Sequence, residues 1–87
     1  MAVPIELPEL GAEDEPVRVS SWFVEPGDRV DAGEQVVELL LPGMTFDVFA
    51  PSAGVLTRIE KPLDATVKTG DILGWIAPEP KLAEDGI

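Results

Sequence analysis

The chain repeats itself across its two halves, and this repeat restricts the folds open to it. The segment VDAGEQVVEL begins at Val30 and VKTGDILGWI begins at Val67, an offset of 37 positions (67 minus 30). Both copies contain Val-x-x-Gly followed by an acidic residue, and both follow a proline-containing turn, EPGD at 25–28 and KPLD at 61–64. A pattern this short can also recur by chance. If the repeat is genuine, it predicts two similar β-sheets related by a pseudo-two-fold axis.

Prolines and glycines interrupt the chain too often for long helices. Nine prolines and eight glycines separate short runs of β-branched and aromatic residues, which are typical of strands. We expect an all-β fold, a flattened barrel or sandwich of two four-stranded antiparallel sheets. The expected strands lie near residues 3–8, 17–24, 35–41, 44–50, 54–60 and 72–77, with short extended pieces around Val30 and Val67. The folded domain is predicted to span 1–79, and 80–87 to form a flexible tail.

The composition limits the chemistry of the chain. Cysteine and histidine are both absent, which removes thiol chemistry, the usual general base and the commonest transition-metal ligand. The acidic residues do not have the spacing of a calcium loop, and no phosphate-binding glycine loop occurs. We therefore expect neither an enzyme nor a metal site.

The charge balance limits the partners. The formal net charge is -11, from 17 acidic and 6 basic residues. Nucleic acid and anionic membranes would be repelled, so neither is an expected partner. The charge either attracts basic protein surfaces or only maintains solubility. The first residues resemble no signal peptide and no segment is apolar enough to span a bilayer, so the expected location is cytoplasmic.

The Pro42-Gly43 pair predicts the register of the hairpin around it. With a two-residue loop, one face pairs Leu41 with Met44, Leu39 with Phe46 and Val37 with Val48, and the other pairs Leu40 with Thr45, Glu38 with Asp47 and Val36 with Phe49. We expect the first face in the core and the second toward water, because opposed carboxylates repel each other. Pro-Gly favours a type II turn, whereas two-residue hairpins prefer the primed types, so a wider loop is an alternative.

Four segments resemble the lipoyl domains of 2-oxoacid dehydrogenase acyltransferases, members of the biotinyl/lipoyl carrier family. WFVEPGDRVDAGEQVVEL at 22–39 is similar to their W-x-V-x-x-G-D-x-V-x-x-G-x-x-x-x-E pattern. IELPELG at 5–11, TFDVFAPSAGVL at 45–56 and VKTGDILGWI at 67–76 are similar to other parts of the family pattern. The resemblance runs from about Ile5 to Ile76 and implies a flattened β-barrel of two four-stranded sheets.

The resemblance also shows what this chain lacks. In the family, a lysine at a hairpin tip, usually within Asp-Lys-Ala, carries lipoic acid or biotin. Counting back from Ala50-Pro51, this chain has Pro42, Gly43 and Met44 at those positions. Gly43 therefore occupies the lysine position and has no amine, so we expect no cofactor. The lysines of the chain are Lys61 and Lys68, both predicted in turns, and Lys81, predicted in the tail.

Three functions remain open. The first is an unmodified lipoyl-like domain that acts as a protein-interaction or structural module related to 2-oxoacid dehydrogenase complexes. The second is a genuine swinging-arm carrier of acyl or carboxyl groups that uses a displaced lysine. The third is an enzyme or small-ligand protein on the same fold. The resemblance implies protein partners, such as enzyme components of a 2-oxoacid dehydrogenase complex.

The interaction residues that we predict lie at the hairpin tip and in one loop. They are Leu40, Leu41, Pro42, Gly43, Met44, Glu13, Asp14 and Glu15. By alignment, Leu40 and Leu41 replace the usual Glu and Thr, and Met44 replaces a small residue. Leu40, Met44, Val36 and Phe49 either form an exposed patch suited to a partner or a second copy, or cover the end of the barrel. Residues 11–16 match a loop that in lipoyl domains helps partner recognition, and a merely solvated loop is the alternative.

Overall fold

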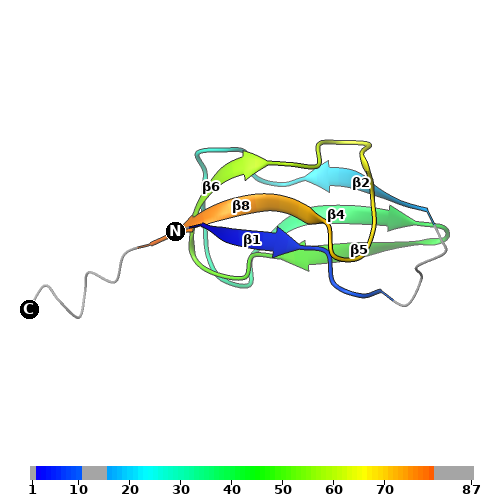
Figure 1. Ribbon diagram of the computed structural model, residues 1–87, viewed down its shortest axis with the longest axis horizontal. Coiled ribbons are helices and arrows are strands. Elements are labelled where there is room, and N and C mark those ends of the chain that lie inside the picture. The colour runs from blue at the N-terminus through cyan, green and yellow to red at the C-terminus, as the bar shows by residue number, and fades with distance from the viewer. Residues whose placement is uncertain (1, 11–15, 80–87) are drawn as a thin grey trace, which may run out of the picture.

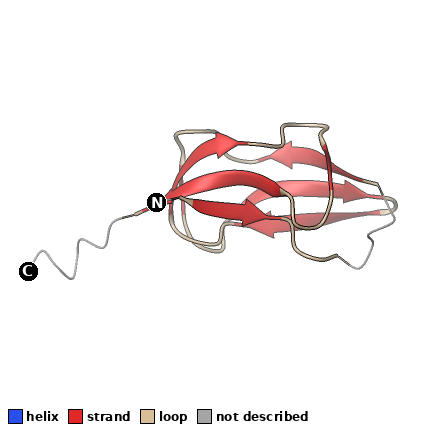
Figure 2. Ribbon diagram, viewed as in Figure 1, coloured by secondary structure: helices blue, strands red, loops and turns tan. Residues whose placement is uncertain are grey.

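The computed structural model describes residues 2–10 and 16–79, which form two four-stranded antiparallel sheets and, within those ranges, no helix (Figures 1 and 2). In sheet A the order is β1 (Val3–Glu6), β8 (Ile72–Pro78), β6 (Gly54–Ile59) and β3 (Arg29–Val30). In sheet B the order is β5 (Met44–Phe49), β4 (Gln35–Leu41), β2 (Val17–Trp22) and β7 (Thr66–Val67). The predicted fold class is confirmed.

The two sheets obey the pseudo-two-fold relation that the repeat predicts. Strands β2, β3 and β4 recur 37 residues later as β6, β7 and β8, with the same lengths (17 to 54, 29 to 66 and 35 to 72). The irregularities of pairing recur as well: β2 shifts register against β4 between Val19 and Ser21, and β6 shifts against β8 between Leu56 and Arg58. Equivalent residues in the two sheets are therefore assigned one by one.

A tight glycine turn recurs in the two halves of the barrel. The N–H of Gly33 donates to the carbonyl oxygen of Ala50 at 2.9 Å, and the N–H of Gly70, which is 37 residues later, donates to that of Leu7 at 3.0 Å. Both glycines have positive φ, 85° and 90°, a conformation that costs glycine little. The repeated Val-x-x-Gly pattern is thus explained by one tight turn that occurs in both halves.

The core lies between the sheets and is entirely apolar in the part of the chain that is described. Its fully buried side chains come in equivalent pairs: Leu39 with Ile76, Val19 with Leu56, and Val36 with Leu73, all 0% exposed. Trp22 packs against this cluster and its indole N–H donates to the carbonyl oxygen of Lys61 at 2.8 Å. Each sheet thus supplies one half of the core.

Two strands end earlier than expected. β1 ends at Glu6 rather than near residue 8, because Leu7 already bonds the turn at Asp71, its N–H donating to the Asp71 carbonyl oxygen at 2.9 Å. β2 ends at Trp22 rather than near residue 24, before the turn in which the N–H of Asp28 donates to the carbonyl oxygen of Glu25. The end of β1 thus depends on a bond to a residue far along the chain, whereas β2 ends before a local turn.

Candidate functional site

The β4–β5 hairpin ends in a two-residue loop at the opposite end of the barrel from the described chain ends (Figure 1). Leu41 pairs with Met44, which leaves Pro42 and Gly43 as the loop. Gly43 has φ of 78°, the value required at the third position of a type II turn, where proline favours the second. The alternative of a wider loop is therefore wrong. Gly43 adopts the positive φ that this turn requires.

The hairpin register follows the prediction for five of its six pairs. Those pairs are Leu41–Met44, Leu40–Thr45, Leu39–Phe46, Glu38–Asp47 and Val37–Val48. The predicted Val36–Phe49 pair is wrong, because a bulge lets Gln35 pair with Phe49 and turns Val36 into the core, where it is 0% exposed. Val36 therefore does not belong to an exposed patch.

The apolar residues of the tip divide into exposed and buried ones. Met44 is 57% exposed, Phe49 53% and Leu40 37%. Leu41 is only 5% exposed, so it supports the hairpin from the core and offers no side chain to a partner. The prediction that Met44 lies in the core beside Leu41 is wrong, because its side chain is mostly exposed although the two residues are paired. Leu40, Pro42 and Met44 are the predicted tip residues whose side chains are accessible.

A shallow groove runs beside the tip. Its volume is about 170 Å³ and it is lined by Pro16, Arg18, Leu40, Leu41 and Pro42. The groove joins the start of β2 to the hairpin because Arg18 and Leu40 are paired in the sheet. Glu13, Asp14 and Glu15, the other predicted interaction residues, lie outside the described residues.

Gly43 presents no group that could hold a cofactor. A Cβ atom at this position would meet no atom within 4 Å, so there is room for a side chain that the sequence does not supply. Lys61 lies in the turn after β6, and Lys68 follows β7, where its N–H donates to the carboxylate of Asp71 at 3.0 Å. Neither lysine is on the hairpin, and Lys81 lies outside the described residues.

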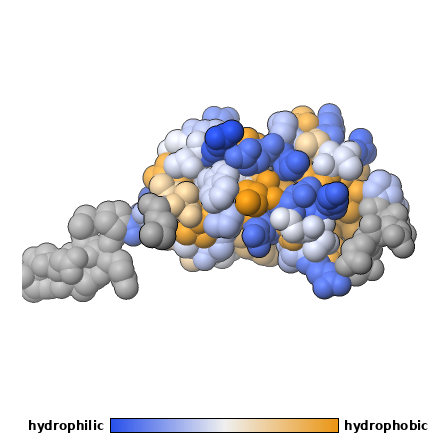
Figure 3. All heavy atoms as spheres, viewed as in Figure 1, coloured by the Kyte–Doolittle hydropathy of each residue, from blue (hydrophilic) through white to orange (hydrophobic). Residues whose placement is uncertain are grey.

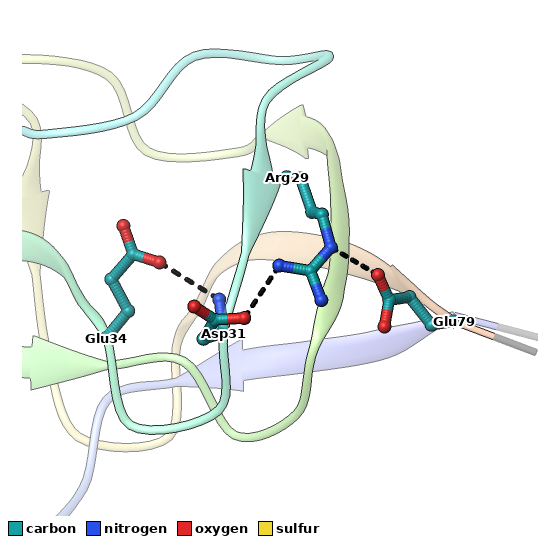
Figure 4. Close-up of polar contacts among 4 residues, drawn as sticks. All are labelled: Arg29, Asp31, Glu34 and Glu79. Atoms are coloured by element: carbon teal, nitrogen blue, oxygen red, sulfur yellow. Dashed lines mark hydrogen bonds and ion pairs between the residues drawn. The ribbon is translucent and has the colours of Figure 1, made fainter. Parts of the chain in front are cut away.

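The opposite end of the barrel carries a small ionic cluster (Figure 4). Arg29 pairs with Glu79 and, at 2.6 Å, with Asp31, whose N–H donates to the carboxylate of Glu34 at 2.9 Å. The hydrogen bond to Glu79, followed by that to Asp31, raises the already high pKa of Arg29 further. These groups are exposed, so the cluster links Arg29 of β3 to Glu79 just after β8 but contributes little to stability.

Two other kinds of site were sought over residues 2–10 and 16–79. No group of three or more Asp, Glu, His or Cys side chains there could hold a metal ion. Within the same ranges no helix is long and apolar enough to cross a membrane.

Comparison with known proteins identifies the family. Residues 3–76 match the biotin/lipoyl family, described as "Biotin-requiring enzyme". The dihydrolipoyllysine-residue succinyltransferase component of the 2-oxoglutarate dehydrogenase complex from Bacillus subtilis is 33% identical over 73 residues, which are 84% of this chain and 18% of that protein. The dihydrolipoyllysine-residue acetyltransferase component of the pyruvate dehydrogenase complex from Corynebacterium glutamicum is 30% identical over 76 residues, 87% of this chain and 11% of that protein. The chain thus spans less than a fifth of these curated relatives.

Solved structures give the same fold. The lipoyl domain of the 2-oxoglutarate dehydrogenase complex from Azotobacter vinelandii aligns with a TM-score of 0.67 at 22% identity, over 92% of this chain and 99% of that one. A single-chain, multi-domain long-chain acyl-CoA carboxylase aligns with a TM-score of 0.75 at 21% identity, over 98% of this chain and 8% of that one. Lipoyl domains are carriers and not catalysts, which agrees with the expectation that this chain is no enzyme. The chain belongs to the biotin/lipoyl family and is a lipoyl-type domain related to components of 2-oxoacid dehydrogenase complexes.

Proposed function

We propose that this domain carries neither lipoate nor biotin and acts as a protein-interaction or structural module related to 2-oxoacid dehydrogenase complexes. The hairpin tip supports this proposal, because the resemblance to lipoyl domains aligns Gly43 with the position of their modified lysine. An amide-linked arm needs an amine, and glycine has none. The two-residue Pro42-Gly43 loop, with φ of 78° at Gly43, is built as a compact turn.

The proposed partners are enzyme components of such a complex. The two relatives described above are named as the succinyltransferase component of a 2-oxoglutarate dehydrogenase complex and the acetyltransferase component of a pyruvate dehydrogenase complex. A domain with their fold but no arm could still occupy a place in such an assembly, holding a partner rather than shuttling a group. The apolar side chains of Leu40 and Met44, both exposed, offer contact area for this role. The cytoplasmic location remains part of the proposal.

The alternative is a swinging-arm carrier that uses a displaced lysine, and one observation favours Lys68 for it. Lys68 follows β7 directly, and β7 pairs with β2 through Val67 and Val17 at the end of sheet B where the hairpin tip also lies. An arm on Lys68 would thus leave the barrel from the same end. Against it, attachment enzymes of the family read a lysine held on the hairpin itself.

Intact-mass measurement separates the two. The domain is expressed in cells that have active lipoate and biotin ligases and are supplied with both acids, beside a lipoyl domain with an Asp-Lys-Ala tip as a positive control. We expect the control to gain a prosthetic group and this domain to retain the mass of the bare polypeptide. A mass gain mapped by peptide analysis to Lys61, Lys68 or Lys81 would establish the carrier instead.

A further inference from the structure

The outer side of the β4–β5 hairpin presents an apolar and acidic surface, here called the ribbon face and defined by Leu40, Glu38, Asp47 and Phe49. Their inward neighbours Val37, Leu39 and Val48 are buried, so alternation along the strands points these four toward solvent. Glu38 pairs directly with Asp47, Leu40 lies one row toward the tip, and Phe49 lies one row away from it. An apolar side chain thus lies on each side of the acidic row, Leu40 in a row with Thr45 and Phe49 in a row with Gln35.

The two carboxylates in the middle row are not neutralised within the described residues. The ion pairs there involve only Arg29 and Arg58 as cations. Arg18, which pairs with Leu40 in the next row, forms none of them. Like charges directly opposite each other on a sheet destabilise it, so the ribbon face keeps an unfavourable pair on its exposed side.

The equivalent place in sheet A has no such pair. By the pseudo-two-fold relation, Trp75 corresponds to Glu38 and Pro4 to Asp47, since Trp75 pairs with Pro4 as Glu38 does with Asp47. The indole N–H of Trp75 donates to Glu60 at 2.9 Å, and Arg58 pairs with the same carboxylate at 3.0 Å. That face satisfies its own polar groups, and Figure 3, seen from the side of β1 and β8, shows polar and apolar residues interspersed there.

We propose that the ribbon face is a docking surface for a basic amphipathic helix of another protein. A lysine or arginine of the helix would lie between Glu38 and Asp47, and apolar side chains on either side would cover Leu40 and Phe49. This inference rests on the proposed function as an interaction module and adds to it the surface and the chemistry of the partner. The net charge of -11 steers such a helix toward the domain and keeps copies of the domain apart.

The spacing of the rows suits a helix. Side chains two residues apart on a strand are about 6.8 Å apart, and side chains four residues apart on a helix rise by about 6.0 Å. A helix with an apolar residue four positions before and four positions after a basic one thus matches three successive rows. The aromatic ring of Phe49, half exposed, is the largest contact that the ribbon face offers.

The test is an NMR titration of the isotope-labelled domain with two synthetic peptides. One is an amphipathic helix of leucine and lysine, and the other is a lysine–serine peptide of equal charge. We expect the leucine–lysine helix to shift the amide signals of β4 and β5 selectively, and the lysine–serine peptide to bind at least about tenfold more weakly because it covers no apolar area. Shifts spread evenly over the domain, or confined to sheet A, would overturn the proposal.

Matched variants test whether the ribbon face itself binds the peptide. Glu38→Gln with Asp47→Asn should weaken binding of the leucine–lysine helix about tenfold, whereas Glu6→Gln with Glu9→Gln, which removes the same charge from exposed positions elsewhere, should change it less than about twofold. Leu40→Ser with Phe49→Ser should also weaken binding, and Leu63→Ser should not. If both charge variants lost the same amount of affinity, binding would depend only on the net charge of the domain, and the proposal would be overturned.

Two other results are distinguishable. If sedimentation shows that the free domain forms a dimer which Leu40→Ser with Phe49→Ser abolishes, the occupant of the ribbon face is a second copy and the helix proposal is wrong. If mass measurement finds a prosthetic group on a lysine but the helix still binds β4 and β5, the docking surface stands and the unmodified-domain proposal falls.

Discussion

Asp64 and Gly27 occupy equivalent positions in the two halves of the barrel, and both have positive φ, 72° and 101°. The N–H of Gly27 donates to the carbonyl oxygen of Leu56 at 2.7 Å, and that of Asp64 to Val19 at 2.8 Å. Each turn is thus bonded to the opposite half. Asp64 is the one residue other than glycine with positive φ in the described ranges, so the two halves share a backbone conformation although only one uses glycine for it.

This relation predicts opposite effects of two exchanges. Asp64→Gly should raise the free energy of unfolding by up to about 1 kcal/mol, because the left-handed conformation costs a residue with a Cβ about 1–2 kcal/mol and glycine gives back part of that in chain entropy. Gly27→Ala should lower it by about 1 kcal/mol. Urea unfolding followed by tryptophan fluorescence measures both. A stabilising Gly27→Ala would contradict the assignment of strain to these turns.

Gly54 is required for a different reason, which is lack of space. A Cβ atom there would lie 2.1 Å from the carbonyl oxygen of Ala77, a backbone atom that cannot move aside alone. We expect Gly54→Ala to lower the free energy of unfolding by at least about 3 kcal/mol, the upper range for overpacking. Gly70→Ala, with φ of 90° and no atom within 4 Å, should cost about 1 kcal/mol. Equal losses would show that β6 and β8 separate easily.

Substitution of a leucine buried between the two sheets should destabilise the fold far more than substitution of an exposed one. Leu56 is 0% exposed and Leu63 is 61% exposed. We expect Leu56→Ala to lower the free energy of unfolding by about 2–5 kcal/mol through lost burial and a residual cavity. Leu63→Ala should change it by less than about 0.5 kcal/mol. Thermal and urea unfolding of the two variants provide the measurement, and a small effect at Leu56 would mean that the core collapses around the cavity.

The hairpin tip can be converted to test how much of a carrier remains. Pro42→Asp with Gly43→Lys should be lipoylated by a lipoate ligase, because the hairpin register is that of a regular two-residue loop. Gly43→Lys alone should be modified less, since Pro42 favours the turn in which the introduced lysine needs positive φ. Intact mass after incubation with ligase, ATP and lipoate gives the yield. No modification of the double variant would show that the hairpin surface itself has diverged.

The symmetric architecture was predictable because its cause is local and repeated. Val30 and Val67, with the glycines that follow them, specify one turn twice, and the strands around them follow at the same offset. The register of the hairpin was predictable as well, because Pro42 and Gly43 fix the loop and alternation fixes the faces. The position of Gly43 at the tip of that hairpin followed from the same reasoning.

The features that the sequence did not predict depend on contacts between distant residues. The bulge that buries Val36 arises where the β4–β5 pairing runs toward the Gly33 turn, which bonds Ala50. The depth of Leu41 and the exposure of Met44 depend on where the barrel ends. The sequence predicts Glu38 and Asp47 as an opposed pair facing water, but only the structure shows that the equivalent pair in the other sheet is Trp75 with Pro4.

The pseudo-two-fold relation places the gap between β8 and β1 where the other sheet has its hairpin loop. β8 and β1 already run antiparallel, with Val3 opposite Ile76, as β4 and β5 do around Pro42 and Gly43. A circular permutant joined between Glu79 and Ala2 by a short linker, and opened between Pro42 and Gly43, would keep every strand register while exchanging the closed ribbon for free ends. The same barrel can therefore be rebuilt with its apex and its base interchanged.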